Sequence, residues 1–538
     1  MDEPINRHLE KALEKTKEKL QRPKESVFKR IAKILTHRLS IGLVLMGLQL
    51  TFYVLSILVF QRYFVHAYVL CSVLSILVTL GIASKRSHPD YRAGWLVVII
   101  AFPVFGTLFY LFFGGSQISD RQRRRLARLD ELTSKALGRS EALVDELATR
   151  DSAAGNQSRY LIRASGYPPH LHTRTEYLPQ GEIFFRRLLE ELEKAERYIY
   201  LEFFILKEGV MWDSILNLLE EKARAGVDVR VLYDDIGSLF TLPKHYAKTL
   251  QERGIACAPF NPFVPVVNLR LNNRDHRKIC VIDGKVGFTG GMNLSDEYIN
   301  QWERFGHWKD TGILLEGAAV WNLVVMFLTM WDYTTGVEEN YEDFRPPQAW
   351  LEEIPTDGIV QPYDASPLAQ ESVGAGVYMN LINHAQRYLY VTTPYLILDD
   401  AMVNAFCRAA RSGVDVRIIT PHIPDKRYVF ELTRANYNPL LEAGVRIFEY
   451  TPGFIHAKTF AVDDAYGVVG TINLDYRSLY LHFEDGVWLY HNSAVLDVRN
   501  DFLKTQAMSE EVFLEETTRI DAIKQLFRAV LRLLAPLL

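Results

Sequence analysis

The chain has 538 residues, of which 48% are hydrophobic and 23% charged, and its formal net charge is −4. This length predicts two to four domains that each bury a core, and the composition excludes a disordered chain, a collagen-like chain and a small disulfide scaffold. The near-neutral charge gives no general affinity for nucleic acid or acidic surfaces. The cysteines form no CxxC pair, so we expect reduced, mostly buried thiols at four positions: Cys71, Cys257, Cys280 and Cys407.

Three charge-free apolar segments follow a basic start at residues 1–39. They are Ser40–Phe60, Phe64–Ala83 and Gly94–Phe113. Each is long enough to cross about 30 Å of hydrocarbon as a helix. A signal peptide is a poor alternative, because the first segment begins late and lacks a small-residue cleavage site. The sequence therefore predicts a membrane anchor at 40–115 with three spans. Two spans with an interfacial segment, or buried core helices, are the alternatives.

Basic residues on both sides of this anchor give conflicting evidence on its orientation. The segment 1–39 is rich in Lys and Arg, and the loop 84–93 between the second and third apolar segments is basic too. Placing both in the cytoplasm follows the positive-inside tendency and leaves the rest of the chain outside. An arginine cluster in the connector 116–157 favours the opposite orientation: Arg121, Arg123, Arg124, Arg125 and Arg128. This cluster is either a site for anionic headgroups or a solvated helix start.

The sequence after the connector has the pattern of an α/β protein, and it has this pattern twice. A strand, a helix and a second strand are predicted in each copy, at 198–206, 212–225 and 227–233 and again at 388–393, 401–412 and 414–420. The pentapeptide Gly226–Arg230 is repeated letter for letter at Gly413–Arg417. We therefore predict two duplicated α/β halves, at 158–345 and 346–520, that face each other.

The most specific signal is a motif that also occurs twice, with H-x-K-x4-D spacing. Its copies contain His276, Lys278, Asp283 and Asn293, and His456, Lys458, Asp463 and Asn473. The interval from the aspartate to a later glycine is the same in both copies, and so is the interval from the histidine to the asparagine. Chance would produce one bare motif only about a few hundredths of a time in such a chain, so two extended copies are not coincidence.

These residue types suit the chemistry of a phosphodiester. Residues two apart on a strand project from one face, so the His and Lys of each copy are expected to point at one target. A buried ammonium is costly unless an anion arrives, and the glycine turn lets backbone N–H groups and an amide approach that anion. Two halves together would supply an attacking group, a proton source and hydrogen-bond donors.

Each histidine also needs a partner that fixes its tautomer. Glu484 follows His456 at the start of a predicted strand, and Asp310 has the equivalent place after His276, at a somewhat longer interval. A carboxylate there would hold the imidazole and stabilise its charged form. A surface acid at the end of a strand is the alternative for both.

The paired motifs resemble those of the phospholipase D superfamily, and the sequence from about Phe64 onward is similar to bacterial cardiolipin synthases. The segments that carry this resemblance include LYDDIGS (Leu232–Ser238), GGMNLSDEY (Gly290–Tyr298) and NLDYRSLYLHFE (Asn473–Glu484). Two features depart from the family pattern. One is the N-terminal extension with an extra apolar segment, and the other is His482, where asparagine is more usual.

The resemblance implies a two-step transfer in which a phosphatidyl group passes from phosphatidylglycerol to a histidine and then to a second phosphatidylglycerol. By analogy His276 is the nucleophile and His456 the general acid, although the symmetry of the motifs leaves the reverse order open. Asp283 and Asp463 are expected to support the motif's fold more than the chemistry. The phosphate oxygens would be bound by four side chains: Lys278, Lys458, Asn293 and Asn473. No metal or other cofactor is expected, because the lysines already supply positive charge.

The expected partners are phosphatidylglycerol and anionic lipid at the bacterial cell membrane, not nucleic acid. Phospholipase D hydrolysis or another phosphatidyl transfer is the nearest alternative. A membrane-tethered nuclease would need a basic, aromatic-interleaved stripe that the sequence lacks, and an inactive scaffold would not need both motifs. The apolar-basic helix at 521–538 is expected to lie at the membrane interface or to pack on the domain.

Overall fold

The computed structural model describes residues 38–59, 64–84, 88–114, 120–138, 140–262, 273–369, 371–518 and 521–537. These residues form two compact units. The small unit contains residues 38–114 and 529–537, and the large unit contains the described residues from 120 to 528. Most of the predicted basic segment, and Lys85 and Arg86 of the predicted loop, lie outside the described residues.

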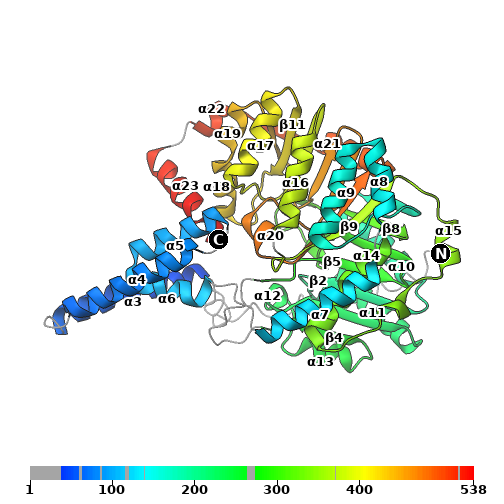
Figure 1. Cartoon of the computed structure of the whole chain (residues 1–538), viewed down its shortest axis with the longest axis horizontal. Coiled ribbons are helices and arrows are strands. Elements are labelled where there is room, and N and C mark those ends of the chain that lie inside the picture. The colour runs from blue at the N-terminus through cyan, green and yellow to red at the C-terminus, as the bar shows by residue number, and fades with distance from the viewer. Residues whose placement is uncertain are drawn as a thin grey trace. The chain divides into compact units, whose positions relative to one another are not determined.

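Four helices make up most of the small unit: α3 (Arg38–Val59), α4 (Phe64–Ser84), α5 (Pro89–Ala101) and α6 (Pro103–Phe113) (Figure 1). The first two coincide with the first two apolar segments. The third segment is not one helix, because the helical backbone is interrupted at Phe102, which has φ −135° and ψ 74°. Pro103 lacks an N–H group and disfavours helical backbone in the residue before it. Helix α5 packs against α6, where the Trp95 and Tyr110 ring centroids are 5.2 Å apart.

The prediction of three membrane spans is therefore wrong for the third segment, which forms two short helices instead. Throughout the described ranges, the structure has no helix that combines the length and the apolar character needed to cross a membrane.

The C-terminal helix α23 (Ala522–Leu534) is followed by the turn η4 (Ala535–Leu537), and its placement at a membrane interface or on the domain stays a prediction. Lys524 and Arg528 pair with Glu431, at 3.2 and 2.9 Å. Within the small unit, Leu537 packs against α5, where a Cβ added to Gly94 would lie 3.2 Å from the Leu537 Cγ.

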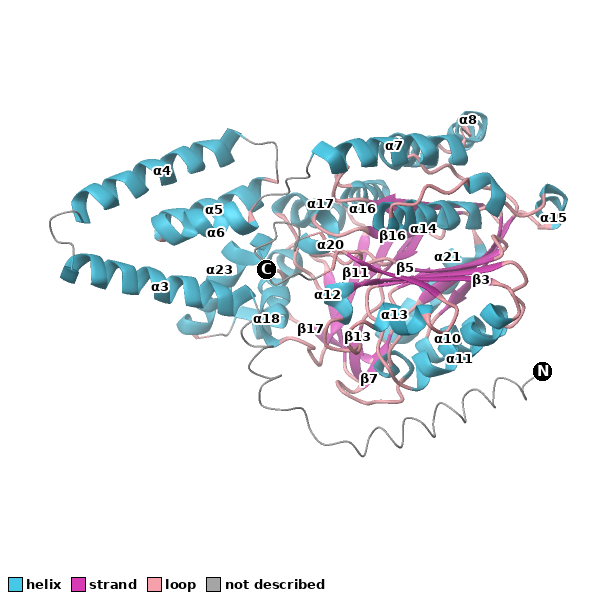
Figure 2. Cartoon of the chain, turned by 90° about the horizontal axis from the view of Figure 1, so that it is seen from below, coloured by secondary structure: helices cyan, strands magenta, loops and turns pink. Residues whose placement is uncertain are grey.

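Two mixed sheets form the centre of the large unit, with helices on their outer faces (Figure 2). The first sheet contains β1 (Thr173–Leu178), β2 (Tyr198–Phe203), β3 (Asp228–Asp234), β4 (Ala256–Phe260), β5 (Lys278–Ile282), β6 (Val286–Gly290) and β8 (Gly312–Gly317). The second contains β9 (Ile359–Ala365), β10 (Tyr388–Thr392), β11 (Asp415–Pro421), β12 (Arg446–Tyr450), β14 (Thr459–Val462), β15 (Tyr466–Gly470), β16 (Glu484–Tyr490) and β17 (Ser509–Val512). The strands β7 (His307–Lys309) and β13 (Gly453–Ile455) pair with each other in parallel.

The predicted duplication into two α/β halves is confirmed by the strand order. The first sheet runs β4-β3-β2-β5-β6-β8-β1, and the second repeats this order as β12-β11-β10-β14-β15-β16-β9, with β17 added at one edge. Both predicted strand–helix–strand units are present, since β2 and β3 flank α11 (Val210–Arg224) and β10 and β11 flank α17 (Asp400–Arg411), each pair parallel. The boundaries predicted for the halves stay predictions.

The repeated pentapeptide occupies the same turn in both halves. Gly226 and Gly413 have φ 92° and 95°, a backbone conformation that glycine adopts without strain. The aspartates that follow, Asp228 and Asp415, accept hydrogen bonds from a tyrosine on the neighbouring strand, at 3.0 and 3.1 Å. The repeated pentapeptide therefore forms the same turn between helix and strand in both halves.

The two halves share an apolar core. Ile279 and Val281 of β5 belong to the same buried cluster as Val469 of β15 and Val487 of β16. Two long helices contribute to this core, α14 (Val320–Thr335) and α21 (Ser493–Gln506). Because both sheets contribute to one core, the two halves form one folded unit.

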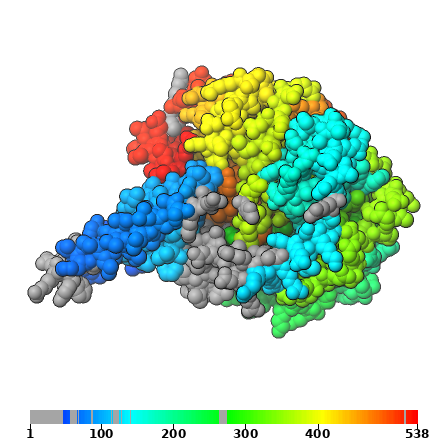
Figure 3. Space-filling model, viewed as in Figure 1, coloured from blue at the N-terminus to red at the C-terminus, as the bar shows by residue number. Residues whose placement is uncertain are grey.

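The connector forms three helices that cover the large unit: α7 (Asp120–Leu137), α8 (Glu141–Arg150) and α9 (Ser152–Ser165). In Figure 3 the cyan surface of α8 and α9 lies against the yellow-green surface of α16 (Val373–His384). Two of the clustered arginines bind protein groups, since Arg125 donates to the Asp332 carbonyl and Arg128 lies 2.6 Å from Glu338. The side chains of Arg121 and Arg123 lie outside the described residues.

Short helices complete the large unit: α10 (Gly181–Leu192), α12 (Asp235–Ser238), α13 (Tyr246–Gln251), η2 (Asp296–Ile299), η3 (Tyr341–Phe344), α15 (Gln348–Glu353), α18 (Arg427–Ala435), α19 (Tyr437–Glu442), α20 (Tyr476–Tyr480) and α22 (Leu514–Thr518). The four cysteines are free thiols, three of them buried and Cys71 partly exposed, as the sequence predicts.

Candidate active site

The two motif histidines lie where the halves meet, and each is held by backbone of the opposite half. His276 donates its backbone N–H to the Phe483 carbonyl at 2.8 Å, and His456 donates to the Lys309 carbonyl at 2.7 Å. Neither histidine lies inside a strand as predicted, because β5 begins at Lys278 and β14 begins after Lys458. Both precede their strands in extended segments that cross to the other half.

The carboxylate partners are crossed between the halves, which corrects the pairing expected from spacing. The Nδ1 atom of His276 lies 2.9 Å from both carboxylate oxygens of Glu484, and Nδ1 of His456 lies 2.7 Å from Oδ2 of Asp310. The cause is the backbone pairing just described, since Phe483 and Lys309 directly precede these two acids. Each histidine is therefore oriented by the half to which it does not belong.

Both carboxylates are fully buried and fixed by further donors. Glu484 accepts a hydrogen bond from the Thr471 hydroxyl at 2.5 Å, and Asp310 accepts one from the Thr311 backbone N–H at 2.8 Å. Burial raises the pKa of Glu484, and the Lys278 ammonium opposes this rise. A carboxylate on Nδ1 holds the Nδ1–H tautomer and leaves the Nε2 lone pair available for chemistry.

Burial also keeps the two histidines neutral. The pKa of His276 is lowered well below its usual value, first by desolvation and then by the Lys278 charge. Desolvation and Lys458 lower the pKa of His456 to about 4, while Asp310 opposes the shift. Neutral imidazoles can act as nucleophile or base without first losing a proton.

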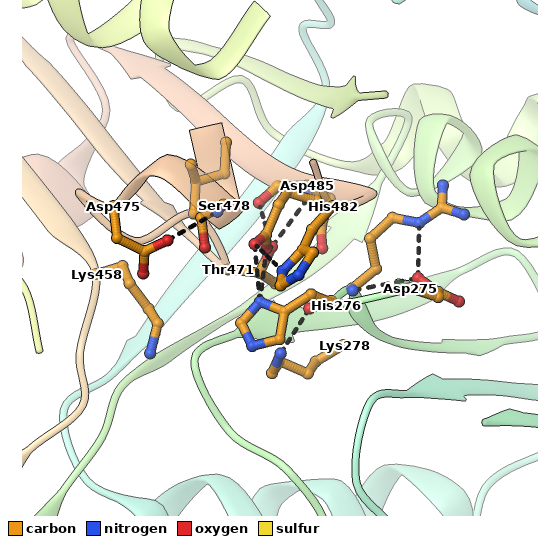
Figure 4. A network of polar contacts seen from close by, with 12 residues as sticks. Asp275, His276, Lys278, Lys458, Thr471, Asp475, Ser478, His482 and Asp485 are labelled. Atoms are coloured by element: carbon orange, nitrogen blue, oxygen red, sulfur yellow. Dashed lines mark hydrogen bonds and ion pairs between the residues drawn. The ribbon is translucent and has the colours of Figure 1, made fainter. Parts of the chain in front are cut away.

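The two motif lysines are buried and lie beside the histidines. Figure 4 shows Lys278 and Lys458, which come from different halves, on two sides of His276. The ammonium of Lys278 donates to the His276 carbonyl at 2.5 Å, and that of Lys458 lies 2.9 Å from Nδ1 of His456. Desolvation lowers the pKa of Lys278 to about 8 and that of Lys458 to about 7. Two buried cations of this kind favour a bound anion.

The two motif asparagines are placed differently. Asn293 Oδ1 accepts from the Ile205 backbone N–H at 3.0 Å, and its Nδ2 donates to the Tyr298 hydroxyl at 2.7 Å. For Asn473 Oδ1, which is buried, no donor occurs in the part of the chain that the structure describes. The phosphate-binding role of both asparagines stays a prediction.

The motif aspartates hold backbone rather than face the histidines. Asp283 accepts from the backbone N–H groups of Glu196, Arg197 and Tyr198, at 2.7 to 2.9 Å. Asp463 repeats this arrangement in the second half with Gln386, Arg387 and Tyr388, at 2.7 and 2.8 Å. Each aspartate thus connects the end of the strand that follows the histidine, β5 or β14, to the start of the neighbouring strand, β2 or β10.

A buried ionic network behind His276 was not predicted from the sequence. Arg277 lies 2.8 Å from Glu202, 3.2 Å from Asp364 and 3.4 Å from Asp275, so it joins both halves. Asp485 accepts from the Thr289 hydroxyl at 2.5 Å, again across the two halves. Only two signals of this network are present in the sequence. One is Arg277 between His276 and Lys278, and the other is Asp485 directly after Glu484.

The duplicated halves, with paired His–Lys motifs at their junction, define a phospholipase D-like protein. A family model described as "Cardiolipin synthase, PLD-like domain" matches residues 188–310 and 378–505. A second, "Phospholipase_D-nuclease N-terminal", matches residues 73–115. The fold is also that of phosphatidylserine synthase from Haemophilus influenzae, which is 16% identical, with a TM-score of 0.53 over 70% of this chain and 96% of that chain.

Curated relatives narrow this class further. A cardiolipin synthase of Geobacillus sp. (strain WCH70) is 36% identical over 87% of this chain and 92% of its own length. A cardiolipin synthase of Halalkalibacterium halodurans is 34% identical over 89% of this chain and 95% of its own length. An uncharacterized protein of Streptococcus mutans is 44% identical over 82% of this chain and 96% of its own length. The chain belongs to the cardiolipin synthase family, which confirms the predicted resemblance.

Proposed function

We propose that this protein is a cardiolipin synthase, which transfers a phosphatidyl group from one phosphatidylglycerol to a hydroxyl of another and releases glycerol. The observation that carries the proposal is the pair of buried imidazoles, His276 and His456, each with a carboxylate on Nδ1. Two buried lysines beside them supply the positive charge that a phosphodiester needs.

In the first step, Nε2 of His276 attacks the phosphorus of phosphatidylglycerol. A P–N bond forms, the P–O bond to glycerol breaks, and His456 gives a proton to the departing glycerol oxygen. His456 is neutral before the lipid binds, but the arriving phosphodiester anion favours its protonation. Asp310, at 2.7 Å from Nδ1, stabilises the resulting imidazolium.

In the second step, His456 takes the proton from a hydroxyl of a second phosphatidylglycerol. The hydroxyl oxygen attacks the phosphorus, the P–N bond breaks, and His276 is regenerated as cardiolipin forms. Glu484 holds the His276 ring in one tautomer through both steps. Lys278, Lys458 and Asn473 bind the non-bridging oxygens, where negative charge builds up in each transition state.

The enzyme works at the membrane, because both substrates and the product are lipids. The N-terminal match at residues 73–115 and the bacterial cardiolipin synthases among the relatives support a location at the bacterial cell membrane. Helices α3 and α4 are the segments with which the chain would associate with the bilayer.

Purified protein supplied with phosphatidylglycerol as the only lipid tests this function. We expect cardiolipin and glycerol in equal amounts, measured by mass spectrometry and an enzymatic glycerol assay. His276→Ala and His456→Ala serve as inactive controls, with thermal unfolding to show that they fold. Phosphatidic acid without cardiolipin would identify a phospholipase D instead.

A further inference from the structure

A third imidazole lies beside the His276–Glu484 pair and has no part in the proposed reaction. His482 is buried, its ring centroid is 5.7 Å from that of His276, and its Nδ1 lies 3.9 Å from Glu484 Oε1. Figure 4 shows His482 next to His276. Potential ligand atoms of His276, His482 and Glu484 all lie within 4.8 Å of one another.

The orientation of Glu484 directs one oxygen at both imidazoles. Its Oε1 lies 2.9 Å from His276 Nδ1 and 3.9 Å from His482 Nδ1, while Oε2 lies equally close to His276 Nδ1 and also accepts the Thr471 hydroxyl. Ligand atoms around a tetrahedral zinc ion, at bonds of about 2.0 to 2.1 Å, are about 3.3 Å apart. To reach that spacing, the 3.9 Å separation between His482 Nδ1 and Glu484 Oε1 must shorten and the 2.9 Å separation between His276 Nδ1 and Oε1 must lengthen.

We propose that His276, His482 and Glu484 form an inhibitory binding site for a zinc-like divalent transition metal. Two imidazole nitrogens and one carboxylate oxygen are a donor set that zinc takes, with a fourth position left for water. Magnesium fits poorly, because it prefers six oxygen ligands. The inference concerns the same site as the proposed function, and its effect on turnover rests on that function.

Inhibition follows from the tautomer of His276. In the metal-free site, Nδ1–H faces Glu484 and the Nε2 lone pair is free to attack phosphorus. A metal bonded to Nδ1 displaces that proton, which moves to Nε2, so no lone pair remains there for the attack. Three coordinate bonds form, one hydrogen bond is lost, and nothing is oxidised or reduced. Removing the metal restores the original tautomer, so the inhibition is reversible.

The second histidine provides an internal contrast. Around His456, the described groups near the ring are Asp310, the Lys458 ammonium at 2.9 Å and the rings of Tyr298, Trp308 and Phe454. These aromatic rings offer no metal ligand, whereas His482 supplies a second imidazole beside His276. The site is therefore expected only at His276.

Cobalt binding tests the site without any turnover, because tetrahedral Co²⁺ absorbs visible light. We expect the full-length protein to bind one Co²⁺ that Zn²⁺ displaces, and His482→Asn to lose at least about tenfold in affinity with the loss of one ligand. His422→Asn is the matched control, since His422 also pairs with a carboxylate, Glu449 at 3.2 Å. His482→Gln serves as a second variant if His482→Asn does not fold.

Cardiolipin synthesis by the same proteins gives the second measurement. Zn²⁺ should inhibit the unsubstituted chain and His422→Asn, EDTA should reverse this, and Mg²⁺ should have no such effect. His482→Asn, with the residue more usual in the family, should synthesise cardiolipin and resist Zn²⁺. Unchanged Co²⁺ affinity in both His482 variants, or no binding by the unsubstituted protein, would overturn the site. Metal binding without cardiolipin synthesis would instead count against the proposed function alone.

Discussion

The two halves of the large unit have the same strand order but hold their histidines by different means. His276 is held by Glu484, whose carboxylate accepts from the Thr471 hydroxyl. His456 is held by the shorter Asp310, and the position equivalent to Thr471 is Gly291. A Cβ on Gly291 would lie 2.1 Å from Asp310 Oδ1, so only a bare backbone leaves room for this acid. The longer Glu484 leaves room for a hydroxyl instead. The duplication thus preserved the histidines and lysines while the supporting side chains diverged.

The side chains around the two imidazole rings also differ between the halves. The His276 ring lies near Phe204 and His482, with centroids 4.9 and 5.7 Å away. The His456 ring lies among larger aromatic residues, and the Lys458 ammonium is 2.9 Å from its Nδ1. Two histidines in such different environments are suited to different roles, one as nucleophile and the other as proton donor and acceptor.

The largest expected effect separates nucleophile from general acid. With a phosphatidyl ester of p-nitrophenol, a good leaving group, the first step still needs the nucleophile but no longer needs a proton donor. His276→Ala should therefore reduce the rate of p-nitrophenolate release in the burst by at least about 10⁴-fold. His456→Ala should keep a burst whose amplitude is one equivalent per protein. The burst is followed by absorbance, and denaturation with detergent at neutral pH traps the phosphatidyl-protein, because its P–N bond is labile in acid. The opposite pattern would exchange the two roles.

A smaller effect tests the crossed carboxylates. Glu484→Gln should slow the burst by about 10²- to 10⁴-fold, because its partner His276 loses the group that fixes its tautomer. Asp310→Asn should leave the burst nearly intact and slow cardiolipin formation, which depends on His456. Rapid-mixing absorbance and lipid analysis measure the two steps separately. If each acid served the histidine of its own half, the two variants would show each other's phenotype.

The strands around the motifs could be predicted from the sequence because they depend on local patterns. Apolar runs and repeated turns gave β2, α11 and β3, and the same unit in the second half. A supporting role for Asp283 could be proposed because it directly follows a predicted strand, and in the structure it accepts from the neighbouring backbone. The break in the third apolar segment falls at Pro103, which the prediction of a third span does not take into account.

The crossed pairing could not be obtained from spacing. The interval between each histidine and the acid that follows it places that acid on a later strand, but it does not say which half that strand approaches. The half that each acid approaches depends on backbone hydrogen bonds such as that from the His276 N–H to the Phe483 carbonyl. These hydrogen bonds form only when the two sheets dock. The unequal use of Asn293 and Asn473 has a local cause instead, because Tyr298 reaches the first asparagine and the equivalent residue in the second half is Ser478.

The smallest predicted effect is a pH dependence that distinguishes the two lysines. Burial lowers the pKa of Lys458 to about 7 and that of Lys278 to about 8, so both lose their charge as the pH rises through this range. The uncharged amines attract the phosphodiester less, and kcat/KM, which reports on the free enzyme, should fall on the alkaline side by about tenfold or less. Bound phosphate stabilises the ammonium forms, so the corresponding fall in kcat should occur at higher pH.

Lys458→Arg gives the decisive comparison for this pH dependence, because a guanidinium stays charged throughout the range. The variant should lose the fall near pH 7 and keep the one near pH 8, with a lower maximum because the planar group does not match the ammonium geometry. Lys309→Arg is the matched control, since Lys309 is also buried but pairs with Asp501 at 2.9 Å. An alkaline fall that is the same in all three proteins would mean that another group titrates, and the difference in lysine charge between the halves would then have no part in binding the lipid.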